Sequence, residues 1–354
     1  MNTVDSVEQW ARDNFHVVEF DSVAWTYCGD GPPSWRKPQP EVEKALDPAN
    51  PGDWWYMLCL ADLRSALTSE ASVLDLGCGP GWPAIPLSPH VAQVAAVDAS
   101  DLAISLIAKA IRSLNVANVD VRQGDAADLP FEDCTYDAVI ASNLMDVVSD
   151  PTRVACEMFR VLKPGGRFVS WVQNFRHVLG DAEQCQRCFE THAGEATYTY
   201  HYASLSPAYS LDLRFRLALQ CAPVAAAGIA EGTLDVDRRE VLDELGVLRP
   251  SIHPDVHAYR TTQFVPETAH EPFRTAGFTD LTVLPLNWDA CAAFADELIR
   301  SQRLPRDGEE FHGLSAGLLA LMRYTDPGKS WEVSVKGTKP ECGAHTRSQM
   351  HGTS

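Results

Sequence analysis

The stretch SVLDLGCGPGWPAIPLSPH, residues 72–90, constrains the fold of this chain more than any other segment. A short apolar run ends at Leu76 and is followed by glycine at every second position, Gly77, Gly79 and Gly81. This pattern predicts a buried strand with a sharp turn at its carboxyl end. Glycine lets such a turn take positive φ and lets the backbone approach a ligand closely.

The segment after the turn is rich in proline, where a strand–turn–helix unit would continue as a helix. Pro83 fits the first turn of a helix, but proline in a helix interior costs about 3 kcal/mol. Pro86 and Pro89 stand in that interior. We therefore predict a short or kinked helix at about residues 82–88.

Apolar runs typical of strands alternate with amphipathic helical patterns from residue 71 to residue 174. Strands are expected near 72–76, 91–98, 119–123, 136–143 and 167–174, and helices over 101–114 and 151–162. This alternation predicts a parallel sheet with helices on both faces. Right-handed crossovers place the strand-to-helix loops at one edge of such a sheet, where ligands bind.

The glycine turn lacks the features of a phosphate-binding loop. A dinucleotide fingerprint needs a small residue at its sixth position, where Trp82 stands, and no G-K-[ST] motif follows. Asp98, at the end of the second strand, can accept hydrogen bonds from both hydroxyls of a ribose. Asp125, after the third strand, can accept one from a base amine, and Asp75 can face a cation through water or orient the loop. The turn therefore favours a nucleoside-like ligand without a pyrophosphate.

The segments VLDLGCGPG, VDAS, GDAADLPFEDCTYDAVIASN and VLKPGGRF occur in this order. Together they resemble a class I S-adenosylmethionine-dependent methyltransferase (methyltransferase type 11), closest to the ubiquinone/menaquinone-type small-molecule methylases. The resemblance covers residues 71–175, a helix and strand near 273–284, and a last strand near 331–337. It implies a Rossmann-like α/β fold, with a seven-stranded, mostly parallel sheet whose last strand is antiparallel.

The resemblance also implies roles for individual residues. Gly77 and Gly79 would lie against the methionine part of the cofactor, and Asp98 would take the ribose hydroxyls. Asp125 and Ala126 would border the adenine, and Ser142 and Asn143 would flank the sulfonium. The full predicted cofactor-binding set is Asp75, Gly77, Cys78, Gly79, Gly81, Asp98, Ala99, Asp125, Ala126, Ser142 and Asn143.

The remaining sequence predicts a cap around this core. Its expected parts are an N-terminal cap segment at 1–70, a helical and aromatic substrate-cap insertion at 176–265, and the end of the core sheet at 266–338 with a helical insertion at 288–328. A disordered tail is expected at 339–354. Rings that could grip a flat or apolar acceptor are Trp25, Tyr27, Tyr200 and Tyr202, with core packing as the alternative.

Candidates for a catalytic base are Asp146, after the fourth strand, and His201, with His177 as a further histidine. The alternative for Asp146 is an acid held by backbone amides at a helix entry, and for either histidine a structural role. A base is needed only for weakly acidic acceptors such as phenols or alcohols.

The net charge and the cysteine content limit the classes of acceptor and the kinds of metal site that the sequence allows. The formal net charge of −19 disfavours nucleic acid and anionic membranes, and no apolar run is long enough for a membrane span. The N-terminal sequence shows no secretory signal, so a cytoplasmic location is expected. Cys185 and Cys188 form the one close cysteine pair, with His192 nearby; no second pair at ligand spacing follows, so no metal is expected and two cysteines on one face of a helix are the simpler interpretation.

These observations predict methyl transfer to a small-molecule acceptor, quinone-like or a secondary metabolite, at carbon or oxygen. The alternatives are a metalloid or protein methyltransferase, and a catalytically silent protein that binds S-adenosylmethionine.

Overall fold

The computed structural model describes residues 5–20, 46–179, 183–192, 195–205, 208–218, 232–326 and 329–341. The chain divides into two compact units. The core unit comprises Pro38–Asp146, Asp150–His177 and Phe264–Ser354, and the second unit comprises Met1–Lys37, Val147–Ser149 and Val178–Gln263. The described residues 46–70 thus belong to the core unit, whereas residues 1–70 were expected to form one N-terminal cap segment.

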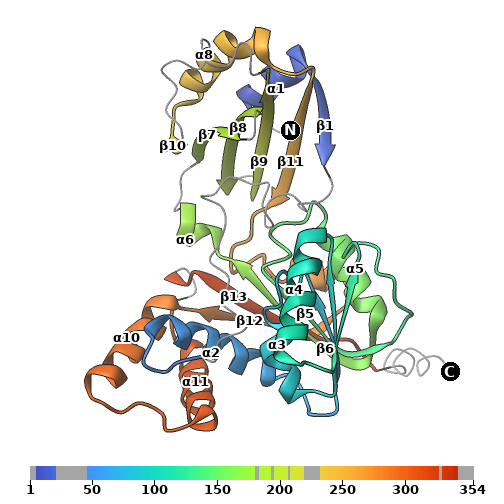
Figure 1. The fold of residues 1–354 in the computed structure, drawn as a ribbon, viewed down its shortest axis with the longest axis vertical. Helices are drawn as coiled ribbons and strands as arrows, with labels where there is room; N and C mark the ends of the chain where they lie inside the picture. Colours follow the sequence, from blue (N-terminus) through green and yellow to red (C-terminus); the bar gives the residue numbers. More distant parts are fainter. Residues whose placement is uncertain are drawn as a thin grey trace, which may run out of the picture. The chain divides into compact units, whose positions relative to one another are not determined.

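The core unit is built on a seven-stranded sheet in the order β12-β13-β6-β5-β2-β3-β4 (Figure 1). Its strands are β2 (Ser72–Leu76), β3 (Gln93–Asp98), β4 (Val119–Gln123), β5 (Tyr136–Ser142), β6 (Leu162–Gln173), β12 (Thr279–Leu286) and β13 (Glu332–Thr338). Neighbours from β4 to β6 pair in parallel, and β13 is antiparallel to both β6 and β12. The predicted seven-stranded, mostly parallel sheet with an antiparallel last strand is confirmed.

The helices of the core unit follow local sequence signals. They are α2 (Pro51–Arg64), α3 (Ala84–Leu87), α4 (Asp101–Leu114), α5 (Pro151–Val161), α9 (Glu271–Ala276), α10 (Trp288–Arg300) and α11 (Gly308–Met322), and α6 (Phe175–Leu179) lies where the chain leaves this unit. For α4, the hydroxyl of Ser100 caps the amide of Ala103 at 3.3 Å. The helix ends at Asn115 in the left-handed region. Its buried residues, Ala103, Ile107 and Ala110, recur at helical spacing.

The proline-rich segment forms the short helix that the sequence predicts. Helix α3 has 4 residues and passes directly into a 3₁₀ turn at Ser88–His90. Trp82 is 9% exposed and belongs to the hydrophobic core. Its ring lies edge-on to Tyr56, with 5.2 Å between the ring centroids. Trp82 is therefore a packing residue at the base of the turn.

A buried carboxylate fastens α2 to the sheet. Asp62 is fully buried, and its Oδ1 lies 2.5 Å from Nζ of Lys336 on β13. Its Oδ2 accepts hydrogen bonds from the Ser334 hydroxyl at 2.6 Å and from Nε1 of Trp171 at 3.0 Å. Helix α2 thus joins strands β6 and β13 through one polar cluster, and none of these partners is near Asp62 in the sequence.

The second unit is a six-stranded sheet in the order β1-β11-β9-β8-β7-β10 (Figure 1). Its strands are β1 (His16–Phe20), β7 (Gln184–His192), β8 (Glu195–Leu205), β9 (Ala208–Leu217), β10 (Gly232–Asp235) and β11 (Asp255–Thr262). Helices α1 (Ser6–Asn14) and α8 (Arg238–Leu248) share its hydrophobic core. All neighbours are antiparallel except β1 and β11, which pair in parallel.

This sheet corrects the expected helical cap at 176–265. Residues Tyr198, Tyr200 and Tyr202 are buried at every second position of β8, which is the period of a strand with one buried face. None of the helices that the structure describes is long and apolar enough to cross a membrane. The expected disordered tail falls mainly on residues 342–354, which lie outside the described residues.

Candidate functional site

The glycine turn lies at the carboxyl end of β2 and is tied to β3. The backbone amides of Gly77 and Cys78 donate to the carbonyl of Val97 at 2.8 and 3.1 Å. Gly77 has φ +67°, and a Cβ there would lie 2.9 Å from Cδ1 of Leu144. Gly79 has φ +50°, and a Cβ there would meet no atom within 4 Å. The turn therefore packs tightly on its Gly77 side and is open beside Gly79.

Asp98 ends β3 and grips the same turn. Its Oδ2 accepts a hydrogen bond from the amide of Gly79 at 2.9 Å, and its Oδ1 accepts one from the amide of Ser100 at 2.9 Å. Each carboxylate oxygen keeps a further lone pair that can accept a ligand hydroxyl. Burial raises the pKa of Asp98 above its ordinary value, against the lowering effect of the Ser100 and Gly79 amides.

Asp75 is a fully buried acid within β2, next to the turn. Among the described residues, no side chain hydrogen-bonds to its carboxylate oxygens, and the backbone amide of Ala84 approaches them without completing a well-aligned hydrogen bond. Burial raises the pKa of Asp75 well above its ordinary value; the Asp98 charge adds to this and the Ala84 amide opposes it. An unpaired buried carboxylate is costly, so this position suits a nearby cation or a hydrogen-bonding ligand.

The loops after β4 and β5 complete this edge of the sheet. The amide of Gly124 donates to the carbonyl of Asp98 at 3.1 Å, which joins the β4 loop to β3. Asp125 is exposed, and its Oδ1 accepts from the Ala127 amide at 2.8 Å. After β5, the half-buried Asn143 has φ 52°, and its backbone N–H donates a hydrogen bond to the carbonyl of Trp171 at 3.0 Å.

The predicted cofactor-binding residues therefore lie on four adjacent strands at one sheet edge. Asp75, Gly77, Cys78, Gly79 and Gly81 belong to β2 and its turn, Asp98 and Ala99 to the end of β3, Asp125 and Ala126 to the β4 loop, and Ser142 and Asn143 to the end of β5. Ser100 was not among the predicted site residues, although it lies two positions after Asp98 and its backbone amide donates a hydrogen bond to that carboxylate. Leu144, which bounds the turn at Gly77, was not among them either.

Asp146 lies after β5 and is buried, at 5% exposure. The acid at the entry of α5 is a different residue, Asp150, whose Oδ1 accepts from the amide of Arg153 at 3.0 Å. Asp150, and not Asp146, therefore caps α5, and a structural role for Asp146 remains the alternative. Its role as a base remains a prediction.

His201 belongs to the second unit, on β8. Its Nδ1 lies 2.6 Å from Oδ1 of Asp212, its cross-strand partner on β9. A histidine paired with a carboxylate is suited to a base, and equally to a structural pair within a sheet. His177 belongs to the core unit, where its ring lies 4.8 Å from that of Trp331.

The predicted substrate-pocket tyrosines lie in the core of the second unit. Tyr200 is fully buried and donates its hydroxyl to Oδ1 of Asp5 at 3.1 Å. Tyr202 donates to Oε1 of Glu183 at 2.7 Å. Both rings are thus packed and both hydroxyls are engaged, as in ordinary core tyrosines. Trp25 and Tyr27 lie outside the described residues.

Cys185 and Cys188 lie on strand β7, and not on a helix as the simpler interpretation had it. Residues three apart on a strand point to opposite faces, so the two sulfurs do not converge. No group of three or more histidine, cysteine or acidic side chains able to hold a metal ion occurs among the residues that the structure describes.

Known proteins share the core segment. A family model described as a methyltransferase domain matches residues 74–170. The uncharacterized methyltransferase YcgJ of Bacillus subtilis is 35% identical over 117 residues, 33% of this chain and 45% of the relative. The chloroplastic 2-phytyl-1,4-beta-naphthoquinone methyltransferase of Arabidopsis thaliana is 41% identical over 101 residues, 27% of this chain and 39% of the relative.

A longer match is the ubiquinone biosynthesis O-methyltransferase of Xanthomonas oryzae, 31% identical over 170 residues, 46% of this chain and 64% of the relative. Among solved structures, the CcbJ methyltransferase of Streptomyces caelestis aligns over 90% of this chain and 96% of its own, with 18% identity and a TM-score of 0.47. The chain spans less than two thirds of the length of each of the three sequence relatives.

The matched segment contains the glycine turn, Asp98 and the β4 and β5 loops, which are the parts that form the edge described above. S-adenosyl-L-methionine is the cofactor of this family. Residues 74–170 are therefore a class I S-adenosylmethionine-dependent methyltransferase domain.

Proposed function

We propose that this protein transfers the methyl group of S-adenosylmethionine to a small-molecule acceptor by in-line displacement. The observation that carries the proposal is the turn at Gly77–Gly81 gripped by Asp98, at the carboxyl edge of a seven-stranded sheet. When bound, the cofactor supplies an electrophilic methyl group on a sulfonium. The protein's part is to bind, align and exclude water.

The residues at this edge fit such a cofactor. Asp98, already oriented by two backbone amides, would accept the ribose hydroxyls on its free lone pairs. The open side of Gly79 leaves room for a ligand against the backbone. The unpaired, buried Asp75 would be stabilised by a positive charge nearby. Asp125, exposed after β4, would accept from the adenine amine.

Cofactor binding is tested by calorimetry with S-adenosylhomocysteine on three proteins: wild type, Asp98→Asn, and Asp120→Asn as a control. Asp120 is an exposed acid on β4, paired with Arg122. Loss of charge-assisted hydrogen bonds at Asp98 should raise the Kd at least about tenfold, while the control should bind like wild type. Equal affinity in Asp98→Asn would refute the ribose assignment.

A ligand-side comparison separates ribose recognition from damage to the turn, because Asp98 also holds two amides. The 2′-deoxy analogue of S-adenosylhomocysteine should bind wild type more weakly than the parent compound does. In Asp98→Asn the difference between the two ligands should shrink. An undiminished difference in the variant would show that another group reads the ribose.

For the acceptor, we propose a quinone-like compound or a secondary metabolite, methylated at carbon or oxygen. The support is that one of the relatives described above is named for a naphthoquinone and another for ubiquinone biosynthesis. A relative from Cereibacter sphaeroides is named as a phosphatidylethanolamine N-methyltransferase, so a screen needs quinols, phenols and amines as separate classes. Labelled S-adenosylmethionine gives the readout: transfer to amines alone would overturn the quinone-like assignment.

Asp146 and His201 are proposed as bases for a hydroxyl acceptor. Asp146→Asn and His201→Gln should then lower kcat and remove one limb of the pH–rate profile, without changing the Kd for S-adenosylhomocysteine. An unchanged profile in either variant would remove that residue from the mechanism.

A further inference from the structure

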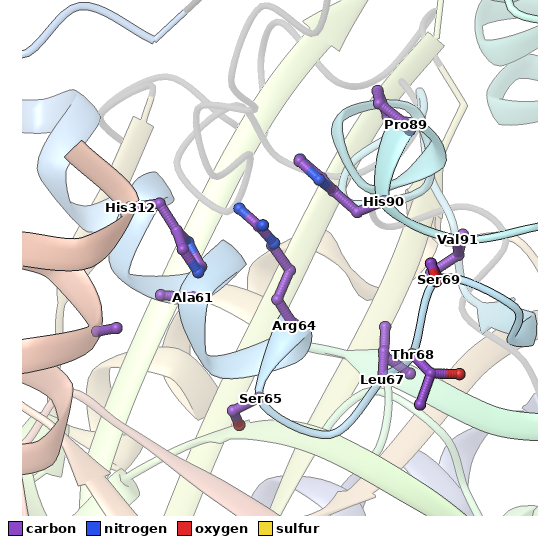
Figure 2. Close-up of a pocket in the computed structure, with 11 residues that line it drawn as sticks. Ala61, Arg64, Ser65, Leu67, Thr68, Ser69, Pro89, His90, Val91 and His312 are labelled. Atoms are coloured by element: carbon purple, nitrogen blue, oxygen red, sulfur yellow. The ribbon is translucent and has the colours of Figure 1, made fainter. Parts of the chain in front are cut away.

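A cavity lies in the core unit at the amino-terminal ends of β2 and β3, opposite the carboxyl ends that carry the glycine turn. It has a volume of about 530 Å³ and is formed by the end of α2, the residues just before β2 and β3, and α11 (Figure 2). It is lined by Ala61, Arg64, Ser65, Leu67, Thr68, Ser69, Pro89, His90, Val91, His312 and Ala316. Its volume falls within the range of small-molecule sites.

Three basic side chains from three elements meet in this cavity. Figure 2 shows Arg64, from the last turn of α2, lying between His312 of α11 and His90 of the 3₁₀ turn. The nearest carboxylate to the guanidinium is that of Glu309, with Oε1 3.9 Å from Nη2 and 81% exposed. In the described part of the chain Arg64 therefore has no hydrogen-bonded acidic partner.

One of the two imidazoles also has a nitrogen without a hydrogen-bond partner in the described part of the chain. Nδ1 of His312 is buried and has no hydrogen-bond partner among the described residues. Burial lowers the pKa of His90 and of His312, and the Arg64 charge lowers both further, while Glu309 opposes this. A buried polar atom without a partner is costly, and the positive charge of Arg64 disfavours protonation of both neighbouring imidazoles while no anion is bound.

The hydroxyl groups on the cavity wall are already engaged. The Ser65 hydroxyl donates to the carbonyl of Asp62 at 2.6 Å, and the Ser69 hydroxyl donates to Glu70 at 2.5 Å. Recognition of a ligand therefore falls to Arg64, His90 and His312. Leu67, Pro89, Val91 and Ala316 offer apolar wall for the uncharged part of a ligand.

We propose that this cavity binds a small organic oxyanion, through Arg64, His90 and His312. The guanidinium presents a planar fork that matches a phosphate or carboxylate group, and an imidazolium adds further charged donors. The cavity is larger than an inorganic anion requires, so a phosphate ester or a polycarboxylate suits it. This site is independent of the proposed methyl transfer and lies away from the residues assigned to the cofactor.

The proposal is tested by calorimetry on the full chain, with pyrophosphate and citrate as probes at an ionic strength held constant with KCl. The proteins are wild type, Arg64→Gln, His312→Gln and the control Arg274→Gln. Arg274 is an exposed cation on α9 paired with Glu271, so the control removes the same charge elsewhere.

We expect one or both probes to bind wild type and the control equally, with the Kd raised at least about tenfold in Arg64→Gln and His312→Gln. Binding of pyrophosphate alone identifies a phosphate ester as the ligand class, and binding of citrate alone identifies a polycarboxylate. Failure of both probes to bind wild type would overturn the proposal, as would equal affinity in Arg64→Gln.

A second measurement does not depend on the variants. In wild type, a bound anion should raise the pKa of His90 and His312, which is followed by the NMR titration of the imidazole protons. Histidines with unchanged titration in saturating probe would also overturn the proposal.

Discussion

Removing the Asp62 carboxylate tests the buried polar cluster that joins α2 to β6 and β13. Asp62→Ala leaves the Lys336 ammonium, which is 23% exposed, without its anion. It also leaves the buried Ser334 hydroxyl and the Trp171 indole without their acceptor. Two strands of the sheet are affected together, because β13 carries two of these partners and β6 carries the third.

The expected loss follows from the burial of the pair. Breaking a buried ion pair by removing one partner costs about 3–5 kcal/mol, since the other charge is left uncompensated. For a domain of 150–250 residues, 1 kcal/mol corresponds to about 2–4 °C in Tm. We therefore expect the transition of the core unit to fall by about 6–20 °C.

Thermal unfolding followed by calorimetry and circular dichroism measures this loss. The control is Asp296→Ala, which removes an exposed acid from α10 and should leave the transition almost unchanged. A double-mutant cycle with Lys336→Gln isolates the pair: the double variant should lose less than the sum of the single losses. A loss below about 1 kcal/mol in Asp62→Ala would refute the reasoning, because a buried ion pair cannot be broken so cheaply.

Three further predictions concern the glycine turn and its acids. Gly77→Ala should lower the free energy of unfolding in urea by more than about 1 kcal/mol, because the new Cβ would lie 2.9 Å from Leu144 in a backbone of φ +67°. Gly79→Ala has space for its Cβ and should lower the free energy of unfolding by less. A larger loss in Gly79→Ala than in Gly77→Ala would contradict this reasoning. Because burial raises the pKa of Asp75 in the folded state, wild type loses stability as the pH rises above about 4, the ordinary pKa of Asp. Asp75→Asn cannot ionise at this position and should not lose this stability, so the Tm of the variant minus that of wild type should increase from pH 4 to 7. A Tm difference that is the same at both pH values would contradict the raised pKa of Asp75. Burial also raises the pKa of Asp98. As the pH is lowered, the Kd for S-adenosylhomocysteine should therefore begin to increase at a pH above about 4, the ordinary pKa of Asp. A Kd that stays constant down to about pH 4 would show that binding does not need the ionised carboxylate.

The core sheet was predictable because its signals are local. The strand–glycine pattern at 72–81 and the apolar spacing in 101–114 each specify their element without help from distant residues. Helix α4 has the predicted bounds, Asp101–Leu114. The acids at the strand ends follow from the same pattern, because parallel strands bring their carboxyl ends to one edge.

The second unit was misjudged although part of its signal was present. Tyr198, Tyr200 and Tyr202 alternate with polar residues, and Leu211, Leu213 and Phe215 do the same on the next strand. This alternation is typical of strands, but clustered aromatic residues are also compatible with a substrate pocket, and the prediction followed that second interpretation.

The remaining features depend on contacts between distant residues. Asp62 meets Ser334 across 272 positions, and Arg64, His90 and His312 come from three separate segments. Local sequence patterns do not specify these long-range contacts, because the contacts form only when the sheet and the helices that cover it are assembled. Both the polar cluster at Asp62 and the basic cavity were therefore visible only in the structure.

The parallel pairing of β1 with β11 has a consequence for synthesis on the ribosome. His16 on β1 and Asp255 on β11 are 239 positions apart, so at about 5–20 residues per second the N-terminal strand waits roughly 10–50 s for its partner. Strands β2 to β6 are translated during this interval. The first strand to be made is thus among the last to be paired, and until then its backbone groups are exposed to the cell's chaperones.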